Sequence, residues 1–170
     1  LHYPNITFTS LQAESMKIPQ LIEKITSDND ENEIEKLTNL ITHAKENYSI
    51  EGIVHGGILS EYQKDNFSLI CEKNQLKIIS PLWNKEPESY MKELLNENFE
   101  YIISTVSSAG LNHSWLGRII DKNGLDELQK LQKKFRFNLN FEGGEAETFV
   151  TNCPLFEKRL LIQDSTTEWD

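Results

Sequence analysis

Short apolar segments alternate with amphipathic segments along most of the chain, and this alternation restricts the fold more than any other feature. The apolar, β-rich segments are 21–25, 50–54, 76–79, 101–106 and 159–163. The segments with helical spacing of apolar residues are 10–17, 30–45, 60–74, 88–96 and 125–135. Strands that alternate with helices in this way predict an α/β domain with a mostly parallel sheet covered by helices on both faces. We expect one domain over 1–170, in which 136–170 is the C-terminal portion.

The strand at 50–54 runs into a glycine pair, Gly56-Gly57. Ligands of open α/β sheets bind outside the carboxyl ends of the strands, so we expect this loop and the loop after Val106 to border a binding site. Ser60 follows at the start of a predicted helix, where a hydroxyl can cap the first backbone N–H groups. Capping is compatible with a binding role for Ser60.

Three glutamates and two glycines stand together in the segment 141–148, Phe-Glu-Gly-Gly-Glu-Ala-Glu-Thr. Adjacent glycines permit unusual φ angles and let backbone N–H groups approach a ligand closely. One interpretation is a cleft into which Glu142, Glu145 or Glu147 points. The alternative is a hairpin turn with solvated acids, because Gly-Gly between strand-like segments is also a hairpin signal. Glu147 alternates with Phe149, so an edge-strand charge is a further alternative for it.

Composition excludes several classes of function. The net charge of −10 argues against direct, non-specific binding of nucleic acid, which depends on Lys and Arg. No apolar segment approaches the roughly 20 residues that span a bilayer, and no secretory signal is visible. Cys71 and Cys153 lack metal-ligand spacing and indicate a reducing compartment. We therefore expect a cytoplasmic protein with no membrane partner and no metal held by side chains.

Three blocks resemble one enzyme family. The segment 142–148 resembles the Glu-Gly-Gly-Glu-x-Glu-Thr signature of the diphthine–ammonia ligases, which are ATP-pyrophosphatase-type enzymes. The segment 56–63 resembles their strand end followed by Ser-x-Tyr-Gln, and Gly110-Leu111 with 114–118 resembles their Gly-Leu…Leu-Gly-Arg element. The resemblance covers nearly the whole chain, from about 2 to about 162. It implies the Rossmann-like fold of the adenine nucleotide alpha hydrolases.

The resemblance also implies a reaction and its participants. Family members use ATP with Mg²⁺ to amidate diphthine on translation elongation factor 2 with ammonium, through an acyl-adenylate that releases AMP and pyrophosphate. A homodimer is compatible with the resemblance. The implied catalytic residues are Glu142, Glu145 and Glu147. The implied substrate-binding residues are Gly143, Gly144, Thr148, Ser60, Tyr62, Gln63, Gly117 and Arg118. Gly56 and Gly57 are the implied cofactor-binding residues.

Physical arguments accompany some of these roles. Diphthine carries a quaternary trimethylammonium group, which has no N–H to donate and must be held by carboxylates or aromatic faces. We therefore expect one or two of the glutamates to bind it, with Tyr62 or Trp115 nearby. Arg118 could hold phosphate or carboxylate with two parallel hydrogen bonds, or it could form an ordinary surface ion pair.

The chain also departs from the family pattern. Family members begin with a strand, a Ser-Gly-Gly-Lys-Asp-Ser-type phosphate loop and a helix, and we expect this chain to lack all three. Phe141, Ala146 and Asn66 stand where the family has glycine, an aromatic residue and a basic residue. These departures leave open a related ATP pyrophosphatase with another substrate, or a non-catalytic α/β module that binds a partner.

Overall fold

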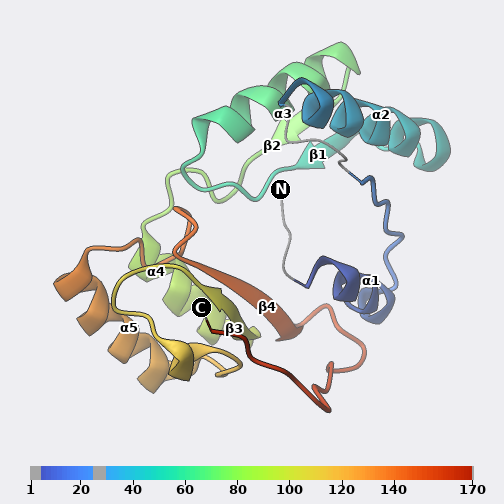
Figure 1. Cartoon of the computed structure of the whole chain (residues 1–170). Coiled ribbons are helices and arrows are strands. Elements are labelled where there is room, and N and C mark those ends of the chain that lie inside the picture. The colour runs from blue at the N-terminus through green and yellow to red at the C-terminus, as the bar shows by residue number, and fades with distance from the viewer. Residues whose placement is uncertain (1–4, 25–29, 170) are drawn as a thin grey trace. The chain divides into compact units, whose positions relative to one another are not determined.

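The structure is a computed structural model that describes residues 5–24 and 30–169. The chain divides into two compact units, and the expectation of one domain stays a prediction. Unit 1 consists of Leu1–Pro19 and Glu86–Asp170, and unit 2 consists of Gln20–Lys85. Both units combine helices with strands (Figure 1), so the α/β class is confirmed.

Unit 2 is a β–α–β arrangement preceded by a long helix. Its elements in chain order are α2 (Asp30–Tyr48), β1 (Gly52–Val54), α3 (Glu61–Lys73) and β2 (Lys77–Ile79). The strands β1 and β2 pair in parallel with Ile53 opposite Ile78, which confirms the expected parallel pairing. Apolar residues at helical spacing form α2 and α3, as the sequence predicts.

The core of unit 2 lies on one face of its sheet. Ile41 of α2 packs with Ile70 and Cys71 of α3, and Ile53 and Ile78 of the sheet pack against this cluster. Alternate residues of a strand point to opposite faces. Val54 and Ile79 therefore point away from the cluster, and they are 71% and 58% exposed. The helices cover the face that carries Ile53 and Ile78.

Unit 1 is built around an antiparallel pair of strands, which the sequence analysis did not anticipate. Its elements are η1 (Ile6–Phe8), α1 (Thr9–Met16), α4 (Pro87–Asn96), β3 (Glu100–Val106), η2 (His113–Trp115), α5 (Lys122–Phe135) and β4 (Ala146–Asn152). The strands β3 and β4 pair over their whole length, with Ile103 opposite Thr148 and Val106 opposite Ala146. Among the described residues, each of the two sheets has two strands.

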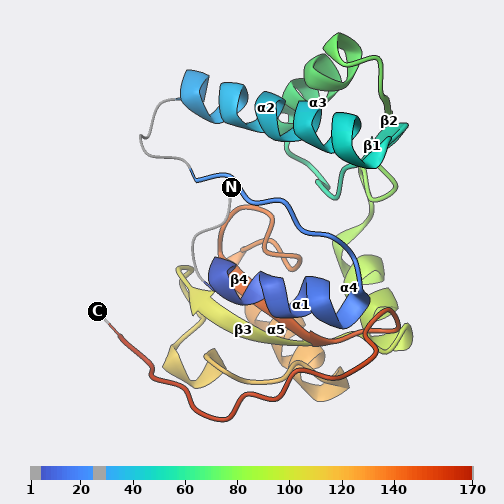
Figure 2. The same cartoon turned by 90° about the vertical axis from the view of Figure 1, so that its right-hand side faces the viewer.

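Helices lie on both faces of the β3–β4 pair (Figure 2). On one face Phe8 meets Phe149 edge-on with ring centroids 6.5 Å apart, and Gln12 of α1 donates a hydrogen bond to the Val150 carbonyl. On the other face Ile103 packs with residues of α4 and α5, such as Met91 and Leu128. This second face forms the main core of unit 1 and supports the segment 136–145.

Two local predictions from the sequence were wrong. Residues 159–163 form no strand, because β4 takes the pairing position beside β3 and the tail makes only scattered contacts, such as Leu160 N–H to the Thr151 carbonyl. Residues 21–24 have no regular structure, and Ile25 lies outside the described residues. The helix predicted at 10–17 is present as α1, with Phe8 as its N-cap.

Burial predicts which leucines stabilise unit 1. Leu128 is 0% exposed and Leu155 is 65% exposed. Leu128→Ala should lower the free energy of unfolding by about 2–5 kcal/mol, because it removes buried methyl groups and leaves a cavity. Leu155→Ala, the same chemical change at the surface, should change it by less than about 0.5 kcal/mol. Chemical denaturation of both variants measures the difference, and equal losses would contradict the packing described.

Candidate functional site

The segment between α5 and β4 folds into a turn that is tied together by Glu145. The Glu145 carboxylate accepts hydrogen bonds from the backbone N–H of Asn138 at 2.8 Å and of Gly143 at 2.9 Å. Gly144 adopts a φ of +79°, and its N–H donates to the Phe141 carbonyl at 3.0 Å. A side chain at Gly143 would collide with Glu145, since an added Cβ would lie 2.7 Å from Oε1. The glycines are thus needed for the shape of the turn.

This turn is not a hairpin. The strand β4 pairs with β3, which lies some forty residues earlier in the chain, and the alternative of a Gly-Gly hairpin is therefore wrong. Ser107, just after β3, donates its hydroxyl to the Gly144 carbonyl and its N–H to the Glu145 carbonyl. The turn is consequently fixed against the end of β3 by backbone groups as well as by Glu145. We call residues 138–145 the carboxylate turn.

The three glutamates have different surroundings. Glu145 is engaged with backbone donors, which gives it a structural role in the turn. Glu147 lies in β4 opposite Thr105, which confirms the interpretation of its segment as a strand. Glu142 lies near Tyr90: burial raises the pKa of the Tyr90 hydroxyl above its ordinary value, and the negative charge of Glu142 acts in the same direction.

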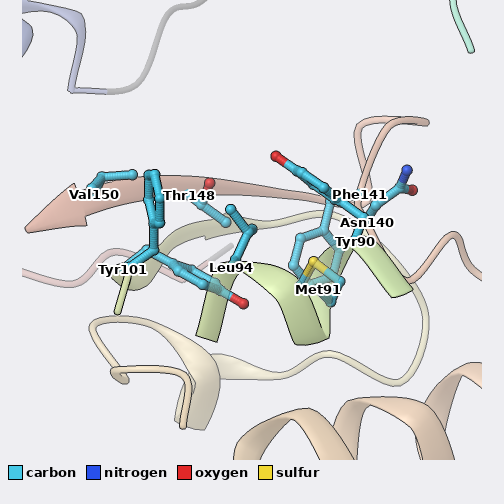
Figure 3. Close-up of a pocket in the computed structure, with 9 residues that line it drawn as sticks. Tyr90, Met91, Leu94, Tyr101, Asn140, Phe141, Thr148 and Val150 are labelled. Atoms are coloured by element: carbon cyan, nitrogen blue, oxygen red, sulfur yellow. The ribbon is translucent and has the colours of Figure 1, made fainter. Parts of the chain in front are cut away.

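A pocket of about 160 Å³ adjoins the carboxylate turn (Figure 3). It lies between α4, the β3–β4 pair and the turn. Its walls are Tyr90, Met91, Leu94, Phe99, Tyr101, Asn140, Phe141, Thr148 and Val150. Of these residues, the sequence analysis named only Thr148 as a site residue. The apolar spacing of α4 and β3 indicated which of their side chains point inward, but it did not indicate that these side chains line a pocket. Thr148 and Phe141 connect the signature segment to this pocket.

The aromatic walls of this pocket include a deeply buried tyrosine. Tyr101 is 3% exposed, and its hydroxyl has no hydrogen-bond partner within the described structure. Burial raises the pKa of Tyr101 well above its ordinary value, and the nearby Tyr90 adds to this effect. Phe141 is held with a φ of +60°, and its ring stacks on Phe137 with centroids 6.3 Å apart. The pocket therefore has fixed walls.

Arg118 lies outside the residues that line the pocket. Its guanidinium forms two hydrogen bonds with the Glu127 carboxylate, at 2.7 and 2.9 Å, and lies 4.4 Å from the centre of the Trp115 ring. This is the surface ion pair that we considered as the alternative role. Trp115 is buried and has one face covered by Arg118. Gly117 adopts a φ of +73° and donates its N–H to the Ile103 carbonyl at 2.8 Å.

The remaining predicted residues belong to unit 2, at the carboxyl end of β1 and the start of α3. Ser60 is the N-cap of α3 and accepts a hydrogen bond from the Gln63 N–H at 3.3 Å, as predicted. Tyr62 is half-exposed on the first turn of this helix. Gly57 has a packing role, because an added Cβ would lie 2.3 Å from Cε1 of the buried His55. Gly56 has open space around it and is accessible to a ligand.

The described residues contain no group of three or more His, Cys, Asp or Glu side chains placed to hold a metal ion. Among the same residues, no helix is both long enough and apolar enough to cross a membrane. Cys71 and Cys153 are buried free thiols.

Comparison with known proteins identifies the class of the chain. Residues 1–78 match the family model described as the diphthamide synthase N-terminal domain, and residues 86–170 match that of the diphthamide synthase C-terminal domain. These matches meet close to the division between unit 2 and the main part of unit 1. The chain belongs to the diphthamide synthase family.

Similar proteins carry the name diphthine–ammonia ligase. The chain is 32% identical to the one from Homo sapiens over 92% of its own length and 57% of that protein. It is 35% identical to the one from Bos taurus over 78% of its own length and 50% of that protein. It is 33% identical to the one from Schizosaccharomyces pombe over 91% of its own length and 27% of that protein. The chain thus spans about half the length of the first two relatives.

The turn geometry predicts a local effect of removing the Glu145 carboxylate. In Glu145→Ala the N–H groups of Asn138 and Gly143 lose a charged acceptor, and such hydrogen bonds contribute more than neutral ones. Hydrogen exchange at these two amides should accelerate about tenfold or more. Glu168→Ala, an exposed change in the tail, should leave both amides unchanged. Exchange rates that do not respond to Glu145→Ala would contradict the role assigned to Glu145.

Two arginine–carboxylate pairs of unit 1 predict separable pKa changes. The hydrogen bonds of Arg118 lower the pKa of Glu127 below its ordinary value. At Glu100 burial raises the pKa, but hydrogen bonds from Arg159 and Thr151 outweigh it and the net shift is downward. Arg118→Leu should raise the pKa of Glu127 alone, and Arg159→Leu that of Glu100 alone, as measured by NMR titration of the carboxyl carbons.

The sign of the linked stability follows from these shifts. Because each folded pKa is the lower one, each pair stabilises the fold above the ordinary carboxyl range, and this contribution is lost as pH falls through the folded pKa. The stability difference between the native chain and either variant should therefore shrink on acidification. A shift at both carboxylates in either variant would show that the pairs are coupled rather than separate.

Proposed function

We propose that this chain is part of a diphthine–ammonia ligase that amidates diphthine on translation elongation factor 2, using ATP and ammonium. The observation that carries the proposal is the carboxylate turn, which the fold builds beside an aromatic pocket in a chain of the diphthamide synthase family. The relatives that carry this name support it. The reaction would take place in the cytoplasm, and the proposal holds for a monomer or a homodimer.

The proposed chemistry has two steps. A carboxylate oxygen of diphthine attacks the α-phosphorus of ATP, and the bond to pyrophosphate breaks to give an acyl-adenylate. Ammonia then attacks the acyl carbon, the bond to the phosphate oxygen breaks, and AMP leaves with that oxygen. Activation is needed because a free carboxylate is a poor electrophile, and the protein contributes mainly orientation and charge stabilisation. Mg²⁺ would neutralise charge on the ATP phosphates.

The carboxylates of the signature segment divide into two proposed roles. Glu145 keeps the turn in shape through its backbone hydrogen bonds. Glu142 and Glu147 remain the proposed reactive carboxylates, which would bind ammonium and accept a proton as ammonia attacks. Gly143 and Gly144 would contribute by allowing the conformation of the turn rather than by binding the substrate, because the N–H of each already donates a hydrogen bond within the turn. Thr148 would contact the substrate, since it lines the pocket.

The nucleotide would be bound near the carboxyl end of β1. Gly56 is open there, and Ser60, four residues later, caps the helix α3. The N-terminus of a helix attracts anions through its free N–H groups and dipole. Tyr62 and Gln63 lie in the first turn of the same helix. We propose these residues of unit 2 as contacts for ATP or for the substrate that reacts with it.

A second candidate function is a related ATP pyrophosphatase with a different substrate. It is favoured by Phe141 and Ala146, the two departures from the family signature. Both are buried, and Phe141 lines the pocket. A pocket with altered walls could select another carboxylate, because even small changes of shape in an apolar site affect discrimination.

The direct test is ATP turnover by the full-length protein, with Mg²⁺, ammonium and elongation factor 2 bearing diphthine. We expect AMP release that depends on the factor, together with a mass decrease of the factor that matches exchange of OH for NH₂. Glu147→Gln should reduce this turnover by about 10²-fold or more if Glu147 acts on a proton. Glu168→Gln is the matched control and should keep full turnover.

The other outcomes select among the alternatives. AMP release that does not depend on this factor would overturn the substrate assignment and favour another carboxylate. Absence of ATP binding by the full-length protein would favour the alternative that the chain is a non-catalytic module that binds a partner. Turnover that survives in Glu147→Gln would remove Glu147 from the reaction while keeping the ligase assignment.

A further inference from the structure

The pocket beside the carboxylate turn has a composition that restricts what it can bind. Aromatic rings from three elements line it: Tyr90 from α4, Tyr101 from β3 and Phe141 from the turn. Figure 3 shows Tyr90, Phe141 and Asn140 at one end of this space and Tyr101 and Val150 at the other. Its volume of about 160 Å³ is below the roughly 300 Å³ of the smallest common small-molecule sites. It therefore suits one compact chemical group rather than a whole nucleotide.

Two buried polar atoms at this pocket lack partners. The Tyr101 hydroxyl and Asn140 Nδ2 make no hydrogen bond with described residues. Asn140 Oδ1, by contrast, accepts a long hydrogen bond of 3.5 Å from the Glu142 N–H, which orients the amide. Unpaired buried polar groups are costly, and each one in a native structure calls for a partner. Asn140 Nδ2 is a donor, so a ligand that bonds to it must offer an acceptor atom.

The aromatic walls and the nearby charge favour a cation. Aromatic faces attract cations within about 6 Å of the ring centre, and more strongly where water is excluded. Burial raises the pKa of the Tyr90 hydroxyl, and the negative charges of Glu142 and Glu93 nearby act in the same direction. No Lys or Arg lines the pocket. A phosphate group would have no cation to bind here.

The unpaired polar atoms and the aromatic walls together favour a zwitterionic ligand. An apolar ligand would leave Asn140 Nδ2 and the Tyr101 hydroxyl unpaired, and a simple anion would face four rings without a counter-charge. A hydrated inorganic cation is disfavoured because no carboxylate lines the pocket itself. A quaternary ammonium group is large, weakly hydrated and unable to donate hydrogen bonds, so it is suited to rings rather than to carbonyl oxygens.

We propose that this pocket binds the quaternary ammonium group of a betaine-type side chain between Tyr90, Tyr101 and Phe141, with Asn140 donating to its carboxyl oxygen. The identity of the natural ligand rests on the proposed function, because diphthine carries both a trimethylammonium group and the carboxylate that is amidated. We had expected one or two of the signature glutamates to bind this cation with Tyr62 or Trp115 nearby, and that expectation stays a prediction. Trp115 has Arg118 against its ring.

The test uses glycine betaine as the probe, titrated into the full-length protein and followed by NMR. We expect it to bind at least about tenfold more tightly than tert-butylacetate, which has the same shape but no positive charge. Tyr90→Leu should weaken betaine binding about tenfold, while Tyr90→Phe should retain it, because the ring supplies the attraction. Tyr48→Leu, at an exposed tyrosine of α2 that belongs to no proposed site, is the matched control and should have no effect.

A second variant separates the two halves of the ligand. Asn140→Asp replaces a donor by a negative charge of the same size. It should weaken binding of glycine betaine about tenfold or more, and it should not weaken binding of tetramethylammonium, which has no carboxylate. Circular dichroism of each variant checks that unit 1 is folded. Equal loss of both probes in a folded Asn140→Asp protein would overturn the assignment of Asn140.

The outcomes distinguish this inference from the proposed function. If AMP release that depends on the factor is absent, but betaine binds and Tyr90→Leu weakens its binding, the assignment of the pocket is supported and the proposed reaction is overturned. If turnover is present but neither betaine binding nor the KM for the factor changes in Tyr90→Leu, the pocket assignment is overturned. Equal binding of glycine betaine and tert-butylacetate would overturn it as well, since the charge would then contribute nothing.

Discussion

The antiparallel pairing of β3 with β4 determines where the other features of unit 1 lie. These strands are separated by α5 and two loops, and their register places Val106 opposite Ala146. The end of β3 is thereby held beside the carboxylate turn, where Ser107 bonds to Gly144 and Glu145. The same register aligns Tyr101 with Val150 and Ile103 with Thr148 on the face that packs against α4. A one-residue slip would move every one of these side chains to the opposite face.

Several charged residues of this chain serve the structure as well as, or instead of, a reaction. The Glu145 carboxylate accepts hydrogen bonds from two backbone N–H groups of the turn. Hydrogen bonds to a charged acceptor are stronger than those to a neutral one. Arg118 combines an ion pair to Glu127 with a stacked position on Trp115. The ion pair is exposed and contributes little by itself. Proximity of acidic residues in a signature therefore does not assign them a common role.

The pocket and the carboxylate turn form one structural feature. Phe141 and Asn140 belong to the turn and also line the pocket, so the hydrogen bonds that shape the turn also position these walls. Phe141 stands with a positive φ, a conformation that is uncommon for a bulky residue and that recurs at functional positions. Glu142 follows directly and places a negative charge near Tyr90. The proposed cation site and the proposed reactive carboxylate Glu142 would thus be formed by the consecutive residues 140–142.

The sequence by itself determined most of the local elements and indicated the family. Apolar spacing located α2, α3, α4 and α5 to within a few residues, and it located β1, β2 and β3, because burial on one face imposes a period on the chain. The signature residues indicated the family, and Ser60 was correctly expected to cap α3. These features depend on neighbours in the chain, so they can be recognised without a fold.

Tertiary structure decided the partner of β4, the hydrogen-bond partners of Glu145 and the existence of the pocket. The segment 146–152 shows its alternation weakly, and nothing local states that it pairs with a strand forty residues away rather than with a hairpin partner. Glu145 and Glu142 look alike in the sequence, but only the folded turn presents two backbone N–H groups to one of them. The pocket arises from Tyr90, Tyr101 and Asn140, which no spacing connects. Contacts between segments distant in the chain depend on packing, and packing leaves no period in the sequence.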